Sequence, residues 1–270
     1  MNYKIVFSDI DGTFLTSEHK VTPHTADAVR ELLGKGIPFA LVSARMPEAI
    51  YPITRHIGVT IPIISYSGAL VLTEKEEVLY SKTRDKEAAA SVLRRLQQDF
   101  PEVTVNYYAG RKWYVRDTGD RLVQQEMDIT SAVAEGADFA SLLAQDILPH
   151  KILTMSEPEA CARMEKELGE AFPHLHVVRS SAVLLEIMDE SVSKATGIEV
   201  LLAHYGFKPE EAVAFGDNYN DLEMLRYVGC SVAMANAPED IKKEAREVTL
   251  ANNEEGIYNF LVKEGLASRE

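Results

Sequence analysis

Long apolar segments are missing from this chain of 270 residues. The richest apolar window, residues 61–72 (IPIISYSGALVL), falls short of the roughly 18 uninterrupted apolar residues that a transmembrane helix needs. The chain also does not open with a basic segment followed by an apolar one, the pattern of a secretion signal. We therefore expect neither a membrane partner nor secretion.

Cysteine and positive charge are both scarce. Two cysteines, Cys161 and Cys230, lie far apart in apolar segments, which predicts buried, unpaired thiols and a cytoplasmic location.

Lys and Arg number 28 against 42 Asp and Glu, so the net charge is −14. Nucleic acids attract basic surfaces and are not an expected partner. An anionic substrate would need local positive charge, from a metal ion or from a well-placed Lys or Arg.

Apolar segments and amphipathic segments alternate near both ends of the chain. Near-continuous apolar strands separated by helices indicate a parallel sheet that is buried on both faces. The predicted fold class is α/β, with a Rossmann-like, doubly wound parallel sheet. The predicted strands are residues 3–9, 37–45, 61–68, 211–217, 230–236 and 247–250, and the predicted helices are 23–36, 48–58 (kinked or started near Pro52), 221–229, 238–246 and 256–265.

The middle of the chain follows a different pattern, in which polar and aromatic residues alternate with apolar ones. This favours an antiparallel sheet with one face covered by helices. Roughly a hundred residues are enough for a separate core. We therefore predict a discontinuous core domain, residues 1–82 and 186–270, interrupted by an α+β cap domain over residues 83–185.

Polar side chains stand where the predicted parallel strands end. Ligands of open α/β sheets bind at these carboxyl ends, so the side chains are expected to meet in one crevice. Several carboxylates in one place need a cation, and Mg²⁺ is the divalent ion that best suits oxygen ligands. The residues are Asp9 and Asp11 at the end of the first strand, Ser43 at the end of the second, Ser67 and Gly68 at the end of the third, and Asp217 at the end of the strand AVAFGD.

Each of these motifs alone also has an ordinary structural explanation. The segment DIDGT can be a turn with a capping aspartate, and Asp221 in GDNYND can cap the next helix. Ser43 can be a cap, and Lys194 in ESVSKATG can be a surface lysine. The four motifs occur in order, each at the end of a strand or helix, and this combination favours a site.

The segments DIDGT, LVSAR, SVSKATG and GDNYND resemble the four motifs of the haloacid dehalogenase-like phosphohydrolases, over essentially the whole chain. The place and size of the insertion resemble the Cof-like branch with its large α/β cap. One departure is Ser67 in YSGAL, where many relatives carry Asn. The resemblance implies a phosphoric monoester hydrolase.

The resemblance also implies roles for individual residues. Asp9 would be the nucleophile that forms an aspartyl-phosphate, and Asp11 the acid–base group for the leaving alcohol. Lys194 would stabilise charge on the phosphoryl group, and Ser43 would donate a hydrogen bond to it. The implied metal ligands are Asp9, Asp217 and the carbonyl of Asp11, with Asp221 orienting Lys194 or a metal-bound water. The implied substrate contacts are Gly12, Ser43, Ala44, Arg45, Ser67, Gly68, Lys194 and Asn220.

Substrate selectivity is expected from the cap, because the phosphoryl site itself serves many substrates. Trp113 is expected to pack in the cap core. Other candidates for substrate contact in the cap are Tyr107, Tyr108, Arg111, Tyr114, Arg179, Ser180 and Ser181. The seven histidines show no metal-ligand spacing and are expected on surfaces: His19, His24, His56, His150, His174, His176 and His204.

Three functions remain open from the sequence. The leading hypothesis is a Mg²⁺-dependent phosphatase that acts on small phosphorylated metabolites, with sugar phosphates the favoured class. A phosphoryl transferase such as a phosphomutase would share the four motifs and differ only in the cap. A non-catalytic metabolite-binding module is disfavoured, because it would not need both Asp9 and Asp11. The sequence leaves the oligomeric state open between monomer and dimer.

Overall fold

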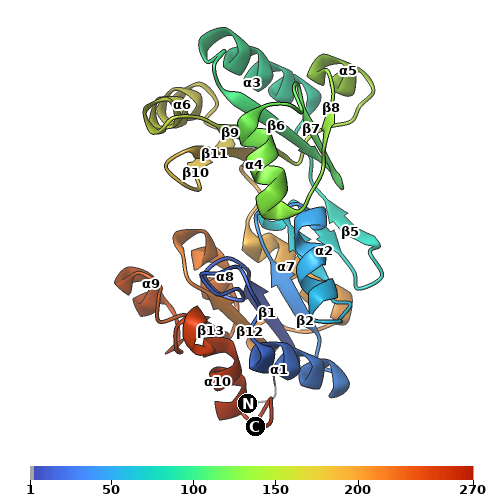
Figure 1. Cartoon of the computed structure of the whole chain (residues 1–270). Helices are drawn as coiled ribbons and strands as arrows, with labels where there is room; N and C mark the ends of the chain where they lie inside the picture. The colour runs from blue at the N-terminus through green and yellow to red at the C-terminus, as the bar shows by residue number, and fades with distance from the viewer. Residues whose placement is uncertain (1–2, 270) are drawn as a thin grey trace. The chain divides into compact units, whose positions relative to one another are not determined.

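A computed structural model describes residues 3–269 and shows two compact units (Figure 1). The first unit runs to Arg45 and contains Ile50–Tyr80 and the chain from Ser193 onward, and the second contains Met46–Ala49 and Ser81–Val192. The predicted cap boundary between residues 185 and 186 lies inside a strand, β11 (Leu184–Asp189). Because β11 pairs on both sides within the second unit, the chain leaves that unit later than predicted.

The first unit is built on an eight-stranded sheet with the order β14-β13-β12-β1-β2-β3-β4-β5. The strands from β14 to β3 run parallel, which confirms the predicted α/β fold. β4 runs antiparallel to β3 and was not predicted. The bounds are β1 Ile5–Asp9, β2 Phe39–Val42, β3 Ile63–Ser65, β4 Leu70–Leu72, β5 Val78–Ser81, β12 Ala212–Gly216, β13 Cys230–Ala233 and β14 Glu247–Val248.

The neighbours of β1 set the position of the site. The chain proceeds from β1 to β2 and β3 on one side, and from β12 to β13 and β14 on the other. Strand order therefore reverses at β1 and β12, and a reversal of this kind is where open α/β sheets bind ligands. Asp9 ends β1, and Asp217 directly follows β12.

The helices of the first unit agree with the prediction apart from their ends. α2 begins at Pro47 and contains Pro52 in its interior. The helices are α1 Pro23–Gly34, α2 Pro47–His56, α7 Lys194–Tyr205, α8 Leu222–Tyr227, α9 Glu239–Glu244 and α10 Gly256–Lys263, and the short 3₁₀ turns are η1 Tyr66–Gly68, η2 Pro209–Glu211, η3 Tyr219–Asp221 and η4 Asn252–Glu254.

Side-chain alternation along β1 decides which way Asp9 points. Ile5 and Phe7 are buried in one apolar cluster with Ile198 of α7. Successive side chains of a strand point to opposite faces, so Asp9 lies on the same face as Ile5 and Phe7. Lys194, the first residue of α7, stands on that face as well. The register of β1 thus directs a carboxylate at an ammonium group.

The second unit contains a six-stranded sheet with the order β10-β11-β9-β6-β7-β8. Most of its pairs are antiparallel, as predicted, but β8 runs parallel to β7. β8 has the sequence AEG, which carries no apolar alternation from which a strand could be predicted. The bounds are β6 Thr104–Ala109, β7 Lys112–Val115, β8 Ala134–Gly136, β9 Lys151–Met155, β10 Leu175–Arg179, α3 Lys86–Asp99, α4 Arg121–Thr130, α5 Phe139–Ala144 and α6 Pro158–Ala171.

Helices α3, α5 and α6 supply one apolar cluster with the sheet, in which Tyr107 and Ile152 are fully buried. Trp113 is also buried, which confirms its predicted role in packing. Its ring stacks on Tyr108 with 5.7 Å between the centroids, and its indole N–H donates to the side-chain oxygen of Asn106 at 2.9 Å.

His150 is the exception among the histidines, because it is buried, whereas the other six are exposed as predicted. Its Nδ1 accepts a hydrogen bond from the backbone N–H of Gly110 at 3.0 Å, and its Nε2 lies 2.9 Å from Oγ of Ser81. Burial lowers the pKa of His150 to about 4, so the ring is neutral at pH 7. The sequence prediction of a surface position was wrong here, because only the fold shows that backbone and hydroxyl partners surround the ring.

Both cysteines are buried and unpaired, as predicted. Over residues 3–269, no helix combines the length and the apolar character that crossing a membrane requires.

Candidate active site

Lys194 lies between two carboxylates and is almost completely buried. Its Nζ donates to Oδ1 of Asp9 at 2.5 Å and to Oδ1 of Asp221 at 2.6 Å. The start of α7 is fixed by Ser193, whose side chain accepts a hydrogen bond from the backbone N–H of Thr196. An N-cap of this kind sets where the helix begins and therefore where its first side chain lies.

A close backbone approach also fixes the start of α7. Gly68 has a φ of +109°, and a Cβ on it would lie 2.0 Å from the carbonyl oxygen of Ser193. Only glycine fits there, so η1 can lie directly against the first turn of α7. Gly68 is thus explained by packing against the helix that carries Lys194.

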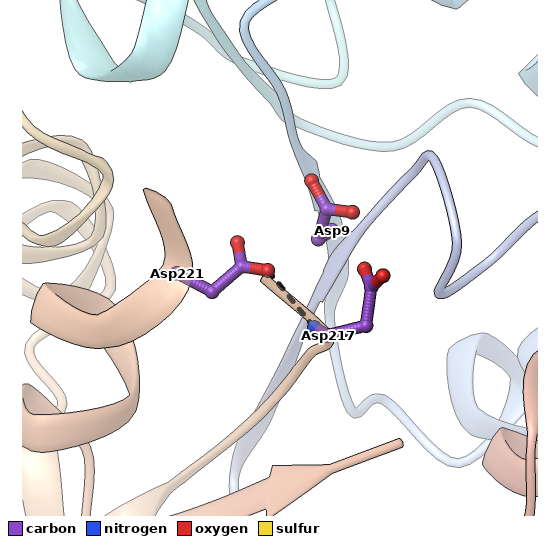
Figure 2. Close-up of side chains that lie close together, drawn as sticks. All are labelled: Asp9, Asp217 and Asp221. Carbon is purple, nitrogen blue, oxygen red and sulfur yellow. Dashed lines mark hydrogen bonds between the residues drawn. The ribbon is translucent and has the colours of Figure 1, made fainter. Parts of the chain in front are cut away.

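Asp221 connects Lys194 with the loop after β12. Its Oδ2 accepts hydrogen bonds from the backbone N–H groups of Asp217 at 2.9 Å and of Asn218 at 3.0 Å. Figure 2 shows the first of these bonds and the three carboxyl groups of Asp9, Asp217 and Asp221 gathered near one another. Because both oxygens of Asp221 already accept hydrogen bonds, its role here is to hold its neighbours in place.

Asp217 is held from the loop that follows β1. Oγ1 of Thr13 donates to Oδ1 of Asp217 at 2.8 Å. Gly12 has a φ of +81°, and a Cβ on it would lie 2.3 Å from Oδ2 of Asp217. Glycine at this position therefore allows both the left-handed backbone and the carboxylate that lies against it.

Charge is unbalanced in this cluster. Carboxylate oxygens of Asp9, Asp217 and Asp221 lie within 4.8 Å of one another, and with all three acids ionised the ammonium of Lys194 would leave an excess of two negative charges. Burial, together with the neighbouring acids, raises the pKa of Asp9 well above its ordinary value, although Lys194 opposes the rise. Burial likewise raises the pKa of Asp217 to about 6.

Lys194 itself stays charged. Burial alone would lower its pKa, but Asp221 and Asp9 outweigh burial and raise the pKa above the ordinary value for lysine. The protonated lysine and the raised pKa values of Asp9 and Asp217 indicate a site that is short of positive charge. The donor set fits a divalent cation, because Asp9 and Asp217 supply the oxygen ligands that such ions prefer.

Asp11 lies outside this cluster. Arg45 donates to both of its oxygens, from Nε to Oδ2 at 2.8 Å and from the second guanidinium nitrogen to Oδ1 at 2.6 Å. The backbone N–H of Arg45 donates to Oγ of the buried Ser43 at 3.1 Å. The two aspartates of the DIDGT segment therefore have separate partners, an ammonium for Asp9 and a guanidinium for Asp11.

The remaining predicted contacts lie around the carboxyl ends of β2 and β3. Ser67 adopts a left-handed backbone, with a φ of 52°, and its N–H donates to the carbonyl of Ser43 at 2.9 Å. Ala44 is half-buried between Ser43 and Arg45. Asn220 is exposed on η3, next to Asp221.

Sequence reasoning missed two polar residues beside Asp217. Thr13 belongs to the DIDGT segment, and its contact with Asp217 could have been suspected from that position. Asn236 follows β13 and lies 3.4 Å from Oδ2 of Asp217. Its signal in the sequence is its place at the end of the predicted strand 230–236, which by itself is too common to single it out.

Residues 6–261 match the family of haloacid dehalogenase-like hydrolases. The chain belongs to this family. A Haemophilus influenzae protein described as a candidate phosphatase is 37% identical over 261 residues, which cover 97% of this chain and 98% of that protein. Phosphatase YwpJ of Bacillus subtilis is 27% identical, and the match covers 96% of this chain and 98% of that protein. The predicted enzyme class, a phosphatase of this family, is thereby confirmed.

Solved structures agree with this assignment. A haloacid dehalogenase-like hydrolase from Bacteroides thetaiotaomicron gives a TM-score of 0.87 at 26% identity, and the match covers 97% of this chain and 99% of that one. A sugar phosphatase of subclass IIB gives a TM-score of 0.82 at 24% identity, and the match covers 98% of this chain and 100% of that one. The two chains therefore share the fold. The predicted resemblance to the Cof-like branch, with its inserted cap, is confirmed.

Proposed function

We propose that this haloacid dehalogenase-like hydrolase is a Mg²⁺-dependent phosphatase of small phosphorylated metabolites, and that Asp9 is its nucleophile. The observation that carries the proposal is the position of Asp9 at the carboxyl end of β1, bonded to the buried ammonium of Lys194 and close to Asp217. Carboxylates held this close without enough positive charge suit a site that is completed by a divalent cation, which would also attract an anionic phosphate.

In the first step, a carboxylate oxygen of Asp9 attacks the phosphorus atom. The new O–P bond forms as the bond from phosphorus to the ester oxygen breaks, and the product is an aspartyl-phosphate. Asp11 donates a proton to the departing alcohol oxygen. Because Arg45 occupies both oxygens of Asp11 in the structure, this proton transfer requires the Arg45 contact to open.

In the second step, a water molecule attacks the phosphorus of the aspartyl-phosphate. Asp11, now a carboxylate, accepts a proton from that water, and the bond between Asp9 and phosphorus breaks. The products are inorganic phosphate and the free Asp9 carboxylate. Throughout both steps Lys194 balances negative charge on Asp9 and on the phosphoryl oxygens, and Ser43 donates a hydrogen bond to one of those oxygens.

The residues that would hold Mg²⁺ are Asp9, Asp217 and the carbonyl of Asp11, with Asp221 orienting Lys194 and the Asp217 loop. When bound, the ion neutralises charge between the nucleophile and the phosphate. Thr13 and Gly12 fix Asp217 for this purpose from the loop after β1.

Sugar phosphates are the proposed substrate class. The support is the shared fold with a subclass IIB sugar phosphatase and the inserted cap unit, which is large enough to supply substrate contacts. Tyr107 is fully buried in the apolar cluster of the second unit, which disfavours it as a substrate contact; the other cap candidates and a cytoplasmic location stay predictions.

The test is phosphate release from sugar phosphates, nucleotides and p-nitrophenyl phosphate, with Mg²⁺ or with EDTA. Asp9→Asn should abolish release, whereas Asp27→Asn, which changes an exposed acid of α1, should not. Release that survives Asp9→Asn or ignores EDTA would contradict the proposal. Conversion of a sugar phosphate into an isomer without phosphate release would identify a phosphomutase, and ligand binding without turnover a non-catalytic module.

A further inference from the structure

Three asparagines from the C-terminal part of the chain hold the loop that follows the nucleophile strand. Nδ2 of Asn236 donates to the carbonyl of Gly12 at 2.9 Å, and Nδ2 of Asn252 donates to the carbonyl of Leu15 at 2.8 Å. Oδ1 of Asn253 accepts from the backbone N–H of Ser17 at 2.9 Å. We call these three residues, Asn236, Asn252 and Asn253, the asparagine clasp.

Two members of the clasp are joined to each other. The backbone N–H of Asn252 donates to Oδ1 of Asn236 at 3.1 Å. Because Oδ1 of Asn236 already accepts this hydrogen bond, the amide is fixed with its Nδ2 directed at Gly12 and Asp217. An amide nitrogen carries two hydrogens, so one nitrogen can serve both acceptors.

Asn236 is the member of the clasp that reaches Asp217. Its Nδ2 lies 3.4 Å from Oδ2 of Asp217, a long contact to a charged acceptor, while Thr13 holds Oδ1 of the same carboxylate. Asn236 also holds Gly12, whose backbone lies against that carboxylate. Asn236 thus acts on Asp217 in two ways, by direct contact and by fixing Gly12.

We propose that Asn236 is a positioning residue that sets the affinity of the site for its divalent cation through Asp217, and that Asn253 does not share this role. The inference rests on the proposed function. Donors that orient a metal-holding carboxylate reduce the freedom it loses when the ion binds, and removing such a partner typically weakens metal affinity about 10–100-fold.

The test is Mn²⁺ binding to the metal-free protein, measured by electron paramagnetic resonance without substrate. Asn236→Ala should raise the dissociation constant about tenfold, near the lower end of the range for such partners. Asn253→Ala removes hydrogen bonds to the same loop, but over residues 3–269 the side-chain hydrogen bonds of Asn253 all join it to Ser17, so the dissociation constant should stay within about twofold of wild type.

Phosphate release supplies a second readout. Asn236→Ala should raise the Mg²⁺ concentration needed for half-maximal activity by the same factor as the Mn²⁺ dissociation constant, with kcat at saturating Mg²⁺ and KM for the ester near wild type. If the role of Asn236 were purely structural, Asn236→Ala would lower the melting temperature, and it would not weaken metal binding while leaving kcat at saturating Mg²⁺ unchanged. If Asn236→Ala does not fold, Asn236→Ser removes the same amide and is expected to weaken Mn²⁺ binding in the same direction.

The outcomes separate the inference from the function it rests on. Wild-type protein that binds no Mn²⁺ would overturn the metal-assisted function, and the inference with it. Wild-type protein that binds Mn²⁺, with Asn236→Ala equal to it, would overturn the inference alone. Equal weakening in Asn236→Ala and Asn253→Ala would also overturn it, because the effect would then come from the loop and not from the contact with Asp217.

Discussion

Replacing Lys194 by methionine tests how strongly the acidic cluster depends on its ammonium group. The substitution removes hydrogen bonds of 2.5 Å to Asp9 and 2.6 Å to Asp221, and it leaves both carboxylates buried. Removing one partner of a buried ion pair costs about 3–5 kcal/mol, because the remaining charge is left uncompensated. We therefore expect Lys194→Met to lower the free energy of unfolding by about 3–5 kcal/mol near pH 7.5 without divalent ions.

The pH dependence of this loss has a definite sign. Lys194 lowers the pKa of Asp9 against the effect of burial, so removing Lys194 raises the folded-state pKa of Asp9 further above its unfolded value. A carboxyl group whose pKa is raised in the folded state destabilises that state increasingly as pH rises above the unfolded pKa. The loss in Lys194→Met should therefore be smaller at pH 5 than at pH 7.5.

Urea unfolding followed by circular dichroism, in EDTA at both pH values, measures these differences. Lys242→Met is a matched control, because it breaks an ion pair with the exposed Glu239 and is expected to cost only about 0–1 kcal/mol. Adding Asp221→Asn to Lys194→Met removes one uncompensated charge and should restore part of the loss. A loss below about 1 kcal/mol at pH 7.5, or one that is the same at both pH values, would refute the reasoning.

Further expectations concern the loops around the cluster and the effect of pH on metal binding. Gly12→Ala places a methyl group 2.3 Å from Oδ2 of Asp217 at a φ of +81°, so Mn²⁺ affinity and phosphate release should both fall at least tenfold, as measured by titration and kinetics; wild-type affinity would contradict this. Ser67→Asn should stabilise the protein by a few tenths to about 1 kcal/mol in urea, because Asn tolerates the left-handed backbone at a φ of 52° better than Ser does; a lower stability would count against the strain. Mn²⁺ binding, measured by calorimetry, should weaken by about tenfold or more per pH unit below about pH 6, because the pKa of Asp217 is raised to about 6, the pKa of Asp9 is raised as well, and the ion needs both carboxylates; affinity that does not change between pH 7 and pH 5 would contradict this.

The sequence was sufficient to predict that the main charged residues lie close together. Asp9 and Asp217 were placed by apolar strands that end in polar residues, whereas the role of Lys194 came from the resemblance of SVSKATG to a family motif. The strand signals are local and periodic, so they can be recognised without any knowledge of tertiary contacts. The same reasoning predicted the parallel core sheet and the inserted unit.

Contacts between loops were not predictable in the same way. The hydrogen bond from Asn236 to Gly12 joins residues 224 positions apart and leaves no period in the sequence. The pairing of Arg45 with Asp11 depends on the rotamer of a long side chain, which the strand pattern does not set. His150 was misplaced for a related reason, because its burial follows from partners that lie far from it in the sequence.

The position of β1 in the middle of its sheet has a consequence for how the protein is made. β1 pairs with β12, so Val6 lies beside Val213, and β1 emerges from the ribosome long before this partner. The second unit contains the continuous stretch Ser81–Val192 and can begin to fold in that interval. At about 5–20 residues per second, synthesis from β5 to β12 takes on the order of 10 s. During that time Asp9 exists without Lys194 or Asp217, so the nascent chain carries the proposed nucleophile before its partners are present.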